Sequence, residues 1–337
     1  MIGLPSTKLG LDPGTANTLL YVKGRGVAVN EPSLVTIRTS TGTIEAVGGE
    51  AEAGLGRTPR KFQTARPVRA GIISDLKLFD GMLHRFLGKA RISLHRLNVA
   101  IAVPSGMTEV ERLAITESLR NAGAADVLLV DQVVAAARGA GLTIEESRGR
   151  MVVNIGAGVT DVAVISLANI VCGRGTRVAG DEMDAAITAH VRATHKLLIG
   201  ERTAERLKTQ IGSALPNQQE LTLAIKGRCI TRGVPREATV RGCEVREALS
   251  TPLAGIMNAI RETLDQAPPE LSADLIETGI VLTGGSALLR DLGRFISRNC
   301  GLPVKVAENP LSCVILGLAH QVNHLSRYEW RRFGNGH

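Results

Sequence analysis

The chain has 337 residues, of which 44% are hydrophobic and 2% aromatic, and its formal net charge is +8 at pH 7. This length favours two domains with large cores of aliphatic side chains. No apolar run reaches the roughly 18 residues of a membrane-spanning helix, and Met1 to Ser6 lack the features of a secretory signal, so we expect a cytoplasmic protein.

The first half predicts an antiparallel meander followed by alternating helices and strands. Strand-like runs separated by Gly and Pro turns lie at 9–11, 19–22, 27–30, 33–38 and 45–47. From Asp80 the apolar residues recur at the helical period, and a buried strand is expected at 99–103. Thr108 and Glu111 form a capping box before a helix at 109–122. A strand at 127–130 and a helix at 131–140 complete this half.

The second half begins near Arg150 and repeats this plan. Hairpin strands come first, and helices are expected at 181–198, from 203, and at 244–266, 288–299 and 312–325. Pro268 and Pro269 end the longest of these helices. Further strands are expected within 221–240, at 279–282 and at 304–306. No linker rich in Pro, Ser or charge separates the halves, so we expect them to pack closely around a ligand.

One turn motif occurs twice, at 12–18 and at 154–160, and the two copies align residue for residue. In each, an acidic or amide residue ends an apolar strand, a glycine-containing turn and a threonine follow, and a second apolar strand leaves. Successive backbone N–H groups in such a turn bind anions, and a nearby carboxylate can hold the magnesium that phosphates bring. Together with a Gly-rich turn at 283–286, the two copies predict a duplicated domain that binds one phosphate-bearing ligand.

Further motifs resemble the actin-like ATPase superfamily and, within it, the MreB-like bacterial actins. They are DPGTANTLLYV from Asp12, NEPS from Asn30, LGRTP from Leu55, VPSGMTEVER from Val103, VAGDEMD from Val178, IGERTAE from Ile199 and VLTGG from Val281. They extend from residue 9 to about 320, and the set is specific to MreB-like proteins.

The resemblance implies an α/β, actin-like ATPase fold. Two duplicated domains, each with mixed sheets, flanking helices and a smaller inserted subdomain, would hold the nucleotide in the cleft between them. Domain I would comprise 1–143 and 316–337, with its insert at about 31–74. Domain II would comprise 144–315, with its insert at about 182–245.

The resemblance also implies which residues bind ATP and Mg²⁺. The β-phosphate would contact a first loop formed by Gly14, Thr15, Ala16 and Asn17. The γ-phosphate would contact a second loop formed by Gly156, Ala157, Gly158, Val159 and Thr160. Asp12 would hold Mg²⁺ through water. The ribose or adenine would face Glu205 and Lys208, and the adenosine would lie against Gly284, Gly285 and Ser286.

The chain departs from the family at three positions near the expected reaction centre. Gln132 stands where a water-orienting glutamate is expected, Asn154 replaces an aspartate and Ala157 replaces a glycine. Actin resembles this chain at Gln132 and hydrolyses ATP, so Asn154 is the more serious change, because an amide binds a divalent cation less strongly than a carboxylate does. Pro13 also removes a backbone N–H beside the first loop. We predict that nucleotide binding is retained and that hydrolysis by this catalytic pair, Gln132 and Asn154, is slow or absent.

MreB-like proteins resemble one another in docking on the inner face of the cytoplasmic membrane through an apolar loop. Here Ile92 and Leu94 lie among basic residues, which suits an anionic leaflet; a partly packed hairpin is the alternative. The basic, aromatic tail at 327–333 is open to three interpretations: a lipid-interface segment, a platform for single-stranded nucleic acid or a solvated terminus. The net charge of +8 reflects either an arginine-rich composition or an anionic partner.

Three functions stay open. The first is a cytoskeletal protein that binds ATP, polymerises with itself or another MreB-family protein, and supports cell shape with wall-synthesis or membrane adaptor proteins. The second is a non-hydrolysing paralogue that acts as a scaffold in such filaments. The third is a metabolic kinase of the same fold, for which the insert regions look too compact. Nucleic acid is not an expected partner, and we favour the first two functions together. The five cysteines never form a C-x-x-C pair, which predicts buried thiols rather than a zinc site or disulfides.

Overall fold

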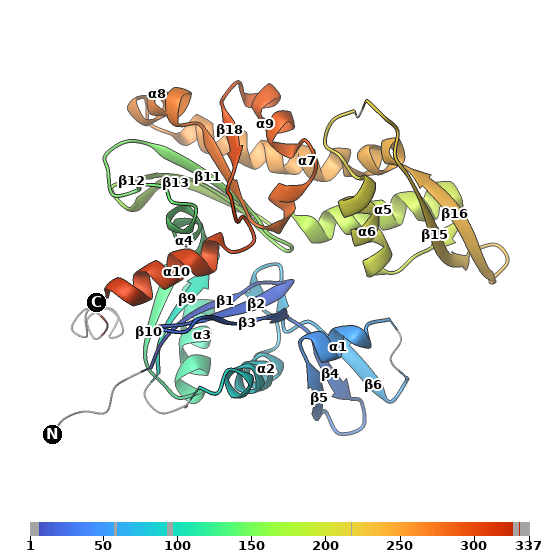
Figure 1. The fold of residues 1–337 in the computed structure, drawn as a ribbon, viewed down its shortest axis with the longest axis horizontal. Coiled ribbons are helices and arrows are strands. Elements are labelled where there is room, and N and C mark those ends of the chain that lie inside the picture. The colour runs from blue at the N-terminus through green and yellow to red at the C-terminus, as the bar shows by residue number, and fades with distance from the viewer. Residues whose placement is uncertain (1–6, 57–58, 93–96, 217, 326–329, 331–337) are drawn as a thin grey trace. The chain divides into compact units, whose positions relative to one another are not determined.

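A computed structural model describes residues 7–56, 59–92, 97–216, 218–325 and 330, and the chain divides into two units (Figure 1). Unit 1 comprises Met1–Thr143 and Leu311–His337, and unit 2 comprises Ile144–Pro310. The sequence prediction places the second boundary five residues later, after residue 315. Each unit contains a five-stranded mixed sheet and a smaller three-stranded sheet.

The main sheet of unit 1 has the strand order β10-β9-β1-β2-β3. Strands β1 (Thr7–Pro13), β2 (Asn17–Val22) and β3 (Gly26–Pro32) form an antiparallel meander. Strands β9 (Leu97–Val103) and β10 (Ala124–Asp131) extend the sheet in parallel with β1. Every residue of β9 is buried, as expected for a parallel strand that is covered on both faces.

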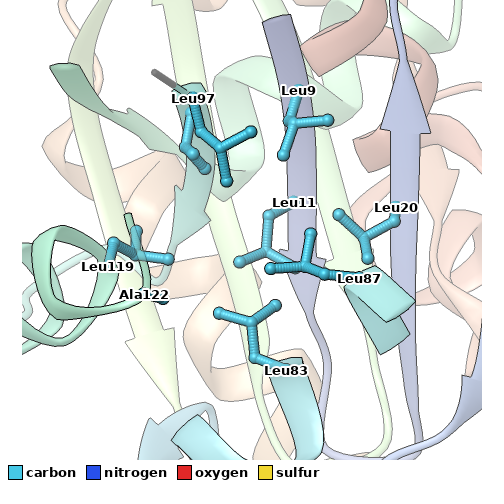
Figure 2. Close-up of a pocket in the computed structure, with 9 residues that line it drawn as sticks. Leu9, Leu11, Leu20, Leu83, Leu87, Leu97, Leu119 and Ala122 are labelled. Atoms are coloured by element: carbon cyan, nitrogen blue, oxygen red, sulfur yellow. The ribbon is translucent and has the colours of Figure 1, made fainter. Parts of the chain in front are cut away.

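Helices α2 (Leu76–Lys89) and α3 (Glu109–Asn121) pack on one face of this sheet. The predicted apolar stripe of α2 is buried, and the predicted capping box starts α3, where the Thr108 N–H donates to Glu111 Oε2 over 2.8 Å. Leucines of β1, β2, β9 and both helices surround a small apolar cavity between these layers (Figure 2). This cavity has no polar side chain in its lining and is therefore part of the core of unit 1.

Helices α4 (Gln132–Gly139) and α10 (Cys313–His324) pack against each other through two glycines. A Cβ atom on Gly139 would overlap the carbonyl oxygen of Cys313, and one on Gly317 would overlap that of Ala135. Leu318 of α10 lies 3.1 Å from the Cβ position of Gly10 in β1. Because Leu9 and Leu11 face α2 and α3, α10 covers the opposite face of the sheet.

The smaller sheet of unit 1 has the order β5-β4-β6 and lies beside the short helix α1. These elements are β4 (Val35–Arg38), β5 (Ile44–Val47), α1 (Gly49–Ala53) and β6 (Phe62–Ala65). The two-residue strands β7 (Val68–Arg69) and β8 (Ile72–Ile73) form a hairpin before α2.

Unit 2 repeats the topology of unit 1, with the order β13-β12-β11-β17-β18. Strands β11 (Arg150–Ile155), β12 (Thr160–Ser166) and β13 (Asn169–Thr176) form the meander, and β17 (Ile280–Thr283) and β18 (Val304–Val306) are parallel to β11. Helices α5 (Gly180–His195) and α7 (Gly242–Gln266) share the core of this sheet. The common strand order and direction confirm the prediction of a duplicated α/β domain.

The remaining elements of unit 2 include a second small sheet, β14-β15-β16. They are β14 (Leu197–Leu198), α6 (Glu201–Ile211), β15 (Thr222–Cys229), β16 (Pro235–Arg241), α8 (Pro269–Thr278), a 3₁₀ turn (Gly285–Leu288) and α9 (Leu292–Cys300). In Figure 1, β15 and β16 form a long hairpin beside α5 and α6.

Two helix predictions were wrong at one end, and one helix was not predicted. Helix α5 ends at His195 rather than 198, because Lys196 adopts a left-handed conformation and the chain turns into β14. Helix α8 was not predicted, although Pro269 at its start is well placed for a first helical residue. Helix α9 starts at Leu292 rather than 288, after the 3₁₀ turn.

Two expectations from composition can be compared with the structure. All five cysteines are free thiols, of which Cys229 and Cys313 are buried as predicted, whereas Cys172, Cys243 and Cys300 are only partly buried. Within the described ranges, every helix is too short or too polar to cross a bilayer.

Candidate functional site

The first loop, Gly14 to Asn17, connects β1 to β2 in unit 1. Asp12, the penultimate residue of β1, pairs with Leu19 across the ladder and is 7% exposed. Burial raises the pKa of its carboxyl from 3.8 to about 7. A buried carboxyl of this kind favours a proton or a cation as its partner.

Ser33 donates two hydrogen bonds to backbone carbonyls of the first loop. Its hydroxyl donates to the Gly14 carbonyl over 2.6 Å, and its N–H donates to the Ala16 carbonyl over 2.8 Å. The C=O of one residue and the N–H of the next point in opposite directions across a trans peptide. The N–H groups of Thr15 and Asn17 are therefore turned away from Ser33. Gly14 cannot be larger, because a Cβ would lie 2.6 Å from the Asn17 carbonyl oxygen.

The second loop, Gly156 to Thr160, connects β11 to β12 in unit 2. The loop is closed by the Gly156 N–H, which donates to the Val159 carbonyl over 2.9 Å. Two further carbonyls of the loop accept from the start of α5: Gly156 from the Gly180 N–H at 3.2 Å, and Ala157 from the Asp181 N–H at 2.7 Å. By the same peptide geometry, the N–H groups of Ala157 and Gly158 point away from α5.

The third turn, Thr283 to Ser286, is bonded directly to the second loop. The Ser286 hydroxyl donates to the Gly156 carbonyl over 2.8 Å. Gly284 has a φ of 83°, and a Cβ there would overlap the Ile155 carbonyl oxygen, so only glycine fits. Gly285 begins the 3₁₀ turn that follows. Unit 2 thus brings together two of the three predicted nucleotide-binding turns.

Asn154 is buried at the end of β11, where the Thr283 hydroxyl donates to its Oδ1 over 3.0 Å. Its cross-strand partner is Asp161, which is 1% exposed. The sequence motif ends at Thr160 and so does not include this carboxylate, which lies directly opposite Asn154.

The other predicted site residues lie on helices. Gln132 opens α4 in unit 1, directly after β10, and is half-buried. Glu205 is exposed on α6, whereas Lys208, one turn later, donates to Asp184 Oδ2 at 2.8 Å and to the Gly180 carbonyl at 3.2 Å. Burial raises the pKa of Asp184 to about 6, although Lys208 opposes this shift. Sequence reasoning did not identify Asp184, whose only signal is its place in the VAGDEMD motif.

The structure describes one of the two predicted membrane residues, Ile92. Ile92 is 8% exposed and belongs to the core of unit 1, so its side chain is not part of an exposed tip. Leu94 lies outside the described residues. Trp330 in the tail is fully buried, with Lys8 Nζ 5.9 Å from the centre of its ring, so its indole is not solvated.

The residues of the first loop fit a magnesium nucleotide. Within the described ranges, no three His, Cys, Asp or Glu side chains gather as a metal site. A single buried carboxylate, Asp12, and N–H groups directed to one side suit Mg²⁺, which commonly binds through one or two carboxylates and substrate phosphates.

Comparisons with known proteins agree on one family. The family model described as MreB/Mbl protein matches residues 6–329. The chain is 46% identical over 322 residues to the cell shape-determining protein MreB of Escherichia coli K12, covering 94% of this chain and 93% of the relative. It is 39% identical over 326 residues to the cell shape-determining protein Mbl of Bacillus subtilis 168, covering 96% and 98%.

Solved structures support the same assignment. MreB5 of Spiroplasma citri bound to AMPPNP superposes with a TM-score of 0.92 at 34% identity, covering 99% of this chain and 100% of that chain. The MamK double helical filament superposes with a TM-score of 0.82 at 20% identity, covering 96% and 100%, which shows a shared fold.

Proposed function

The chain belongs to the MreB/Mbl family of actin-like proteins, and from this premise we propose that it is a cytoskeletal protein that binds ATP, forms filaments and supports cell shape or wall synthesis. The observation that carries the nucleotide part is the way both hairpin loops are held. In each loop, hydrogen bonds fix two carbonyls on one side and so turn backbone N–H groups to the other. Such a row of N–H groups is suited to phosphate oxygens.

In this proposal, each part of the nucleotide contacts a different set of residues. The first loop holds the β-phosphate, the second loop holds the γ-phosphate, and Asp12 holds Mg²⁺ through water. Glu205 faces the nucleoside, and Gly284, Gly285 and Ser286 lie against the adenosine. Mg²⁺ neutralises phosphate charge when it is bound. The structure of MreB5 of Spiroplasma citri bound to AMPPNP supports this assignment of ligand class.

We expect hydrolysis to be weak because of two side chains. The Asn154 amide replaces a carboxylate, and its oxygen already accepts from Thr283. Gln132 can orient a water molecule, but a neutral amide does not accept its proton. Asp161 is the remaining carboxylate in this part of the β11–β12 ladder.

The filament and membrane parts of the proposal depend on family membership. The MreB and Mbl relatives are named for cell shape, and the MamK chain of the same fold is a filament. We propose that filaments form from this chain or with another MreB-family protein. We also propose that the protein lies at the inner face of the cytoplasmic membrane and contacts it through the segment that contains Leu94. Its partners there would be membrane adaptor or wall-synthesis proteins.

Two measurements test the proposal. Calorimetric titration should show ATP binding in the presence of Mg²⁺, and Ser33→Ala should weaken it about fivefold, because one hydrogen bond is worth about 1 kcal/mol. The exposed Ser40→Ala is the matched control. Electron microscopy with ATP or AMPPNP should show filaments. Absence of nucleotide binding, or particles without filaments under all nucleotide conditions, would refute the corresponding part.

Phosphate release tests the prediction of weak hydrolysis. The purified protein with Mg-ATP should release phosphate much more slowly than the Escherichia coli relative does. The double variant Asn154→Asp with Gln132→Glu should be faster than the wild type, because it restores two carboxylates. Equal rates for the wild type and the relative would contradict the prediction.

A further inference from the structure

Lys208 forms a partly buried link between two helices of unit 2. Its ammonium group extends from α6 and donates to the Asp184 carboxylate at 2.8 Å and to the Gly180 carbonyl at 3.2 Å, both within the first five residues of α5. The side chains of Lys208 and Asp184 are 13% and 20% exposed. Two of the three donors of the ammonium group are thus used within the protein.

Gly180 connects this link to the second loop. Its carbonyl accepts from Lys208, and its own N–H donates to the Gly156 carbonyl. A Cβ on Gly180 would lie 2.7 Å from Ser286 Oγ and 3.3 Å from Ala157 Cα, so the helix start lies directly against the loop and the third turn. A shift of α5 along its axis would therefore break both bonds between α5 and the loop.

The orientation of the loop depends on these bonds. The first N–H groups of a helix have no partners within it, and here two of them bind the carbonyls of Gly156 and Ala157. These carbonyls in turn fix the direction of the Ala157 and Gly158 N–H groups. If α5 moved, the N–H groups would no longer converge on one anion.

We propose that Lys208 and Asp184 are positioning residues that hold the second loop in its phosphate-binding conformation through the start of α5. This role rests on the proposed binding of nucleotide. It differs from the role that the family resemblance implies for Lys208, a contact with the ribose or adenine. The two roles predict different ligand selectivity: a positioning role affects the γ-phosphate, whereas a nucleoside contact affects every adenine nucleotide equally.

The test compares the dissociation constants of ADP and AMPPNP, both with Mg²⁺, in variants of the pair. Lys208→Met should weaken AMPPNP binding at least tenfold and ADP binding less than threefold. The double variant Asp184→Asn with Lys208→Met removes both charges, so it should be more thermally stable than Lys208→Met alone. It should still show the selective loss of AMPPNP affinity. Lys226→Met, at an exposed lysine on β15 in the same unit, is the charge-matched control and should match the wild type.

Hydrogen–deuterium exchange tests the chain of contacts without any nucleotide. Peptides that cover 154–161 and 178–184 should exchange faster in both Lys208 variants, whereas a peptide that covers 12–22 in unit 1 should be unchanged. Equal losses of ADP and AMPPNP affinity, or unchanged exchange at 154–161, would overturn the proposal. A wild-type protein that binds neither nucleotide would instead refute the proposed function, while the exchange result would still decide whether the pair holds the loop.

Discussion

Replacing Asp12 by asparagine should stabilise the nucleotide-free protein at neutral pH. Burial raises the pKa of the Asp12 carboxyl from 3.8 to about 7, so the folded state binds this proton more tightly than the unfolded state does. The resulting stability is present below about pH 4, is lost as pH rises to 7, and stays lost above. At about 1.36 kcal/mol per pH unit, the full loss is about 4 kcal/mol. Asparagine carries no charge to desolvate and avoids this loss.

The assay is urea unfolding with EDTA at pH 5 and pH 8, followed by circular dichroism. The advantage of Asp12→Asn over the wild type should grow by about 2–3 kcal/mol between these pH values, since most of the titration lies between them. Mg-nucleotide binding should be weaker in the same variant, which is the usual exchange of stability for function at a site. The exposed Asp265→Asn is the control. A stability difference between Asp12→Asn and the wild type that does not change with pH would refute this reasoning. A wild type that is more stable than Asp12→Asn at pH 8 would refute it as well.

Glycine positions and the membrane segment give further predictions. Gly284→Ala should lower the free energy of unfolding by more than about 3 kcal/mol, whereas Gly233→Ala, also at positive φ but in open space, should cost only about 1 kcal/mol; equal losses in thermal unfolding would contradict this. Gly139→Ala should lower the free energy of unfolding by about 3 kcal/mol, because its methyl group would overlap α10. Gly88→Ala, on the exposed face of α2, should instead raise the free energy of unfolding by about 1 kcal/mol. Leu94→Asp should reduce flotation with anionic liposomes, and unchanged flotation would exclude this segment as the anchor; Ile92→Asp is unsuitable because it would disrupt the core.

Much of the fold could be predicted because its signals are local. The meanders follow from short apolar runs between Gly and Pro turns, and the start of α3 follows from Thr108 and Glu111. The end of α5 could not be predicted, because Leu197 and Leu198 continue an apolar pattern while the left-handed Lys196 carries no distinctive signal. Helix α8 was missed because its two prolines were interpreted only as the end of α7.

The site residues came from motifs, but the contacts that orient them are not local. Ser33 reaches back 19 residues to Gly14, and Ser286 reaches 130 residues to Gly156. The interaction of Lys208 with Asp184 depends on how α6 packs against α5, which neither helix specifies alone. The burial of Ile92 likewise depends on tertiary packing, so an apolar residue among basic ones was a poor guide to exposure.

We expect the departures from the family at Gln132, Asn154 and Ala157 to affect nucleotide binding and hydrolysis differently, for a physical reason. The proposed phosphate binding would depend on backbone N–H groups, and in the second loop the bonds that orient them involve the carbonyls of residues 156 and 157, which alanine supplies as well as glycine. Hydrolysis depends on side chains that accept a proton or hold the cation's shell. Those are the groups that Asn154 and Gln132 replace by neutral amides. We therefore expect this chain to retain ATP binding, and ATP in the proposed filaments should persist for longer than in relatives that keep both carboxylates.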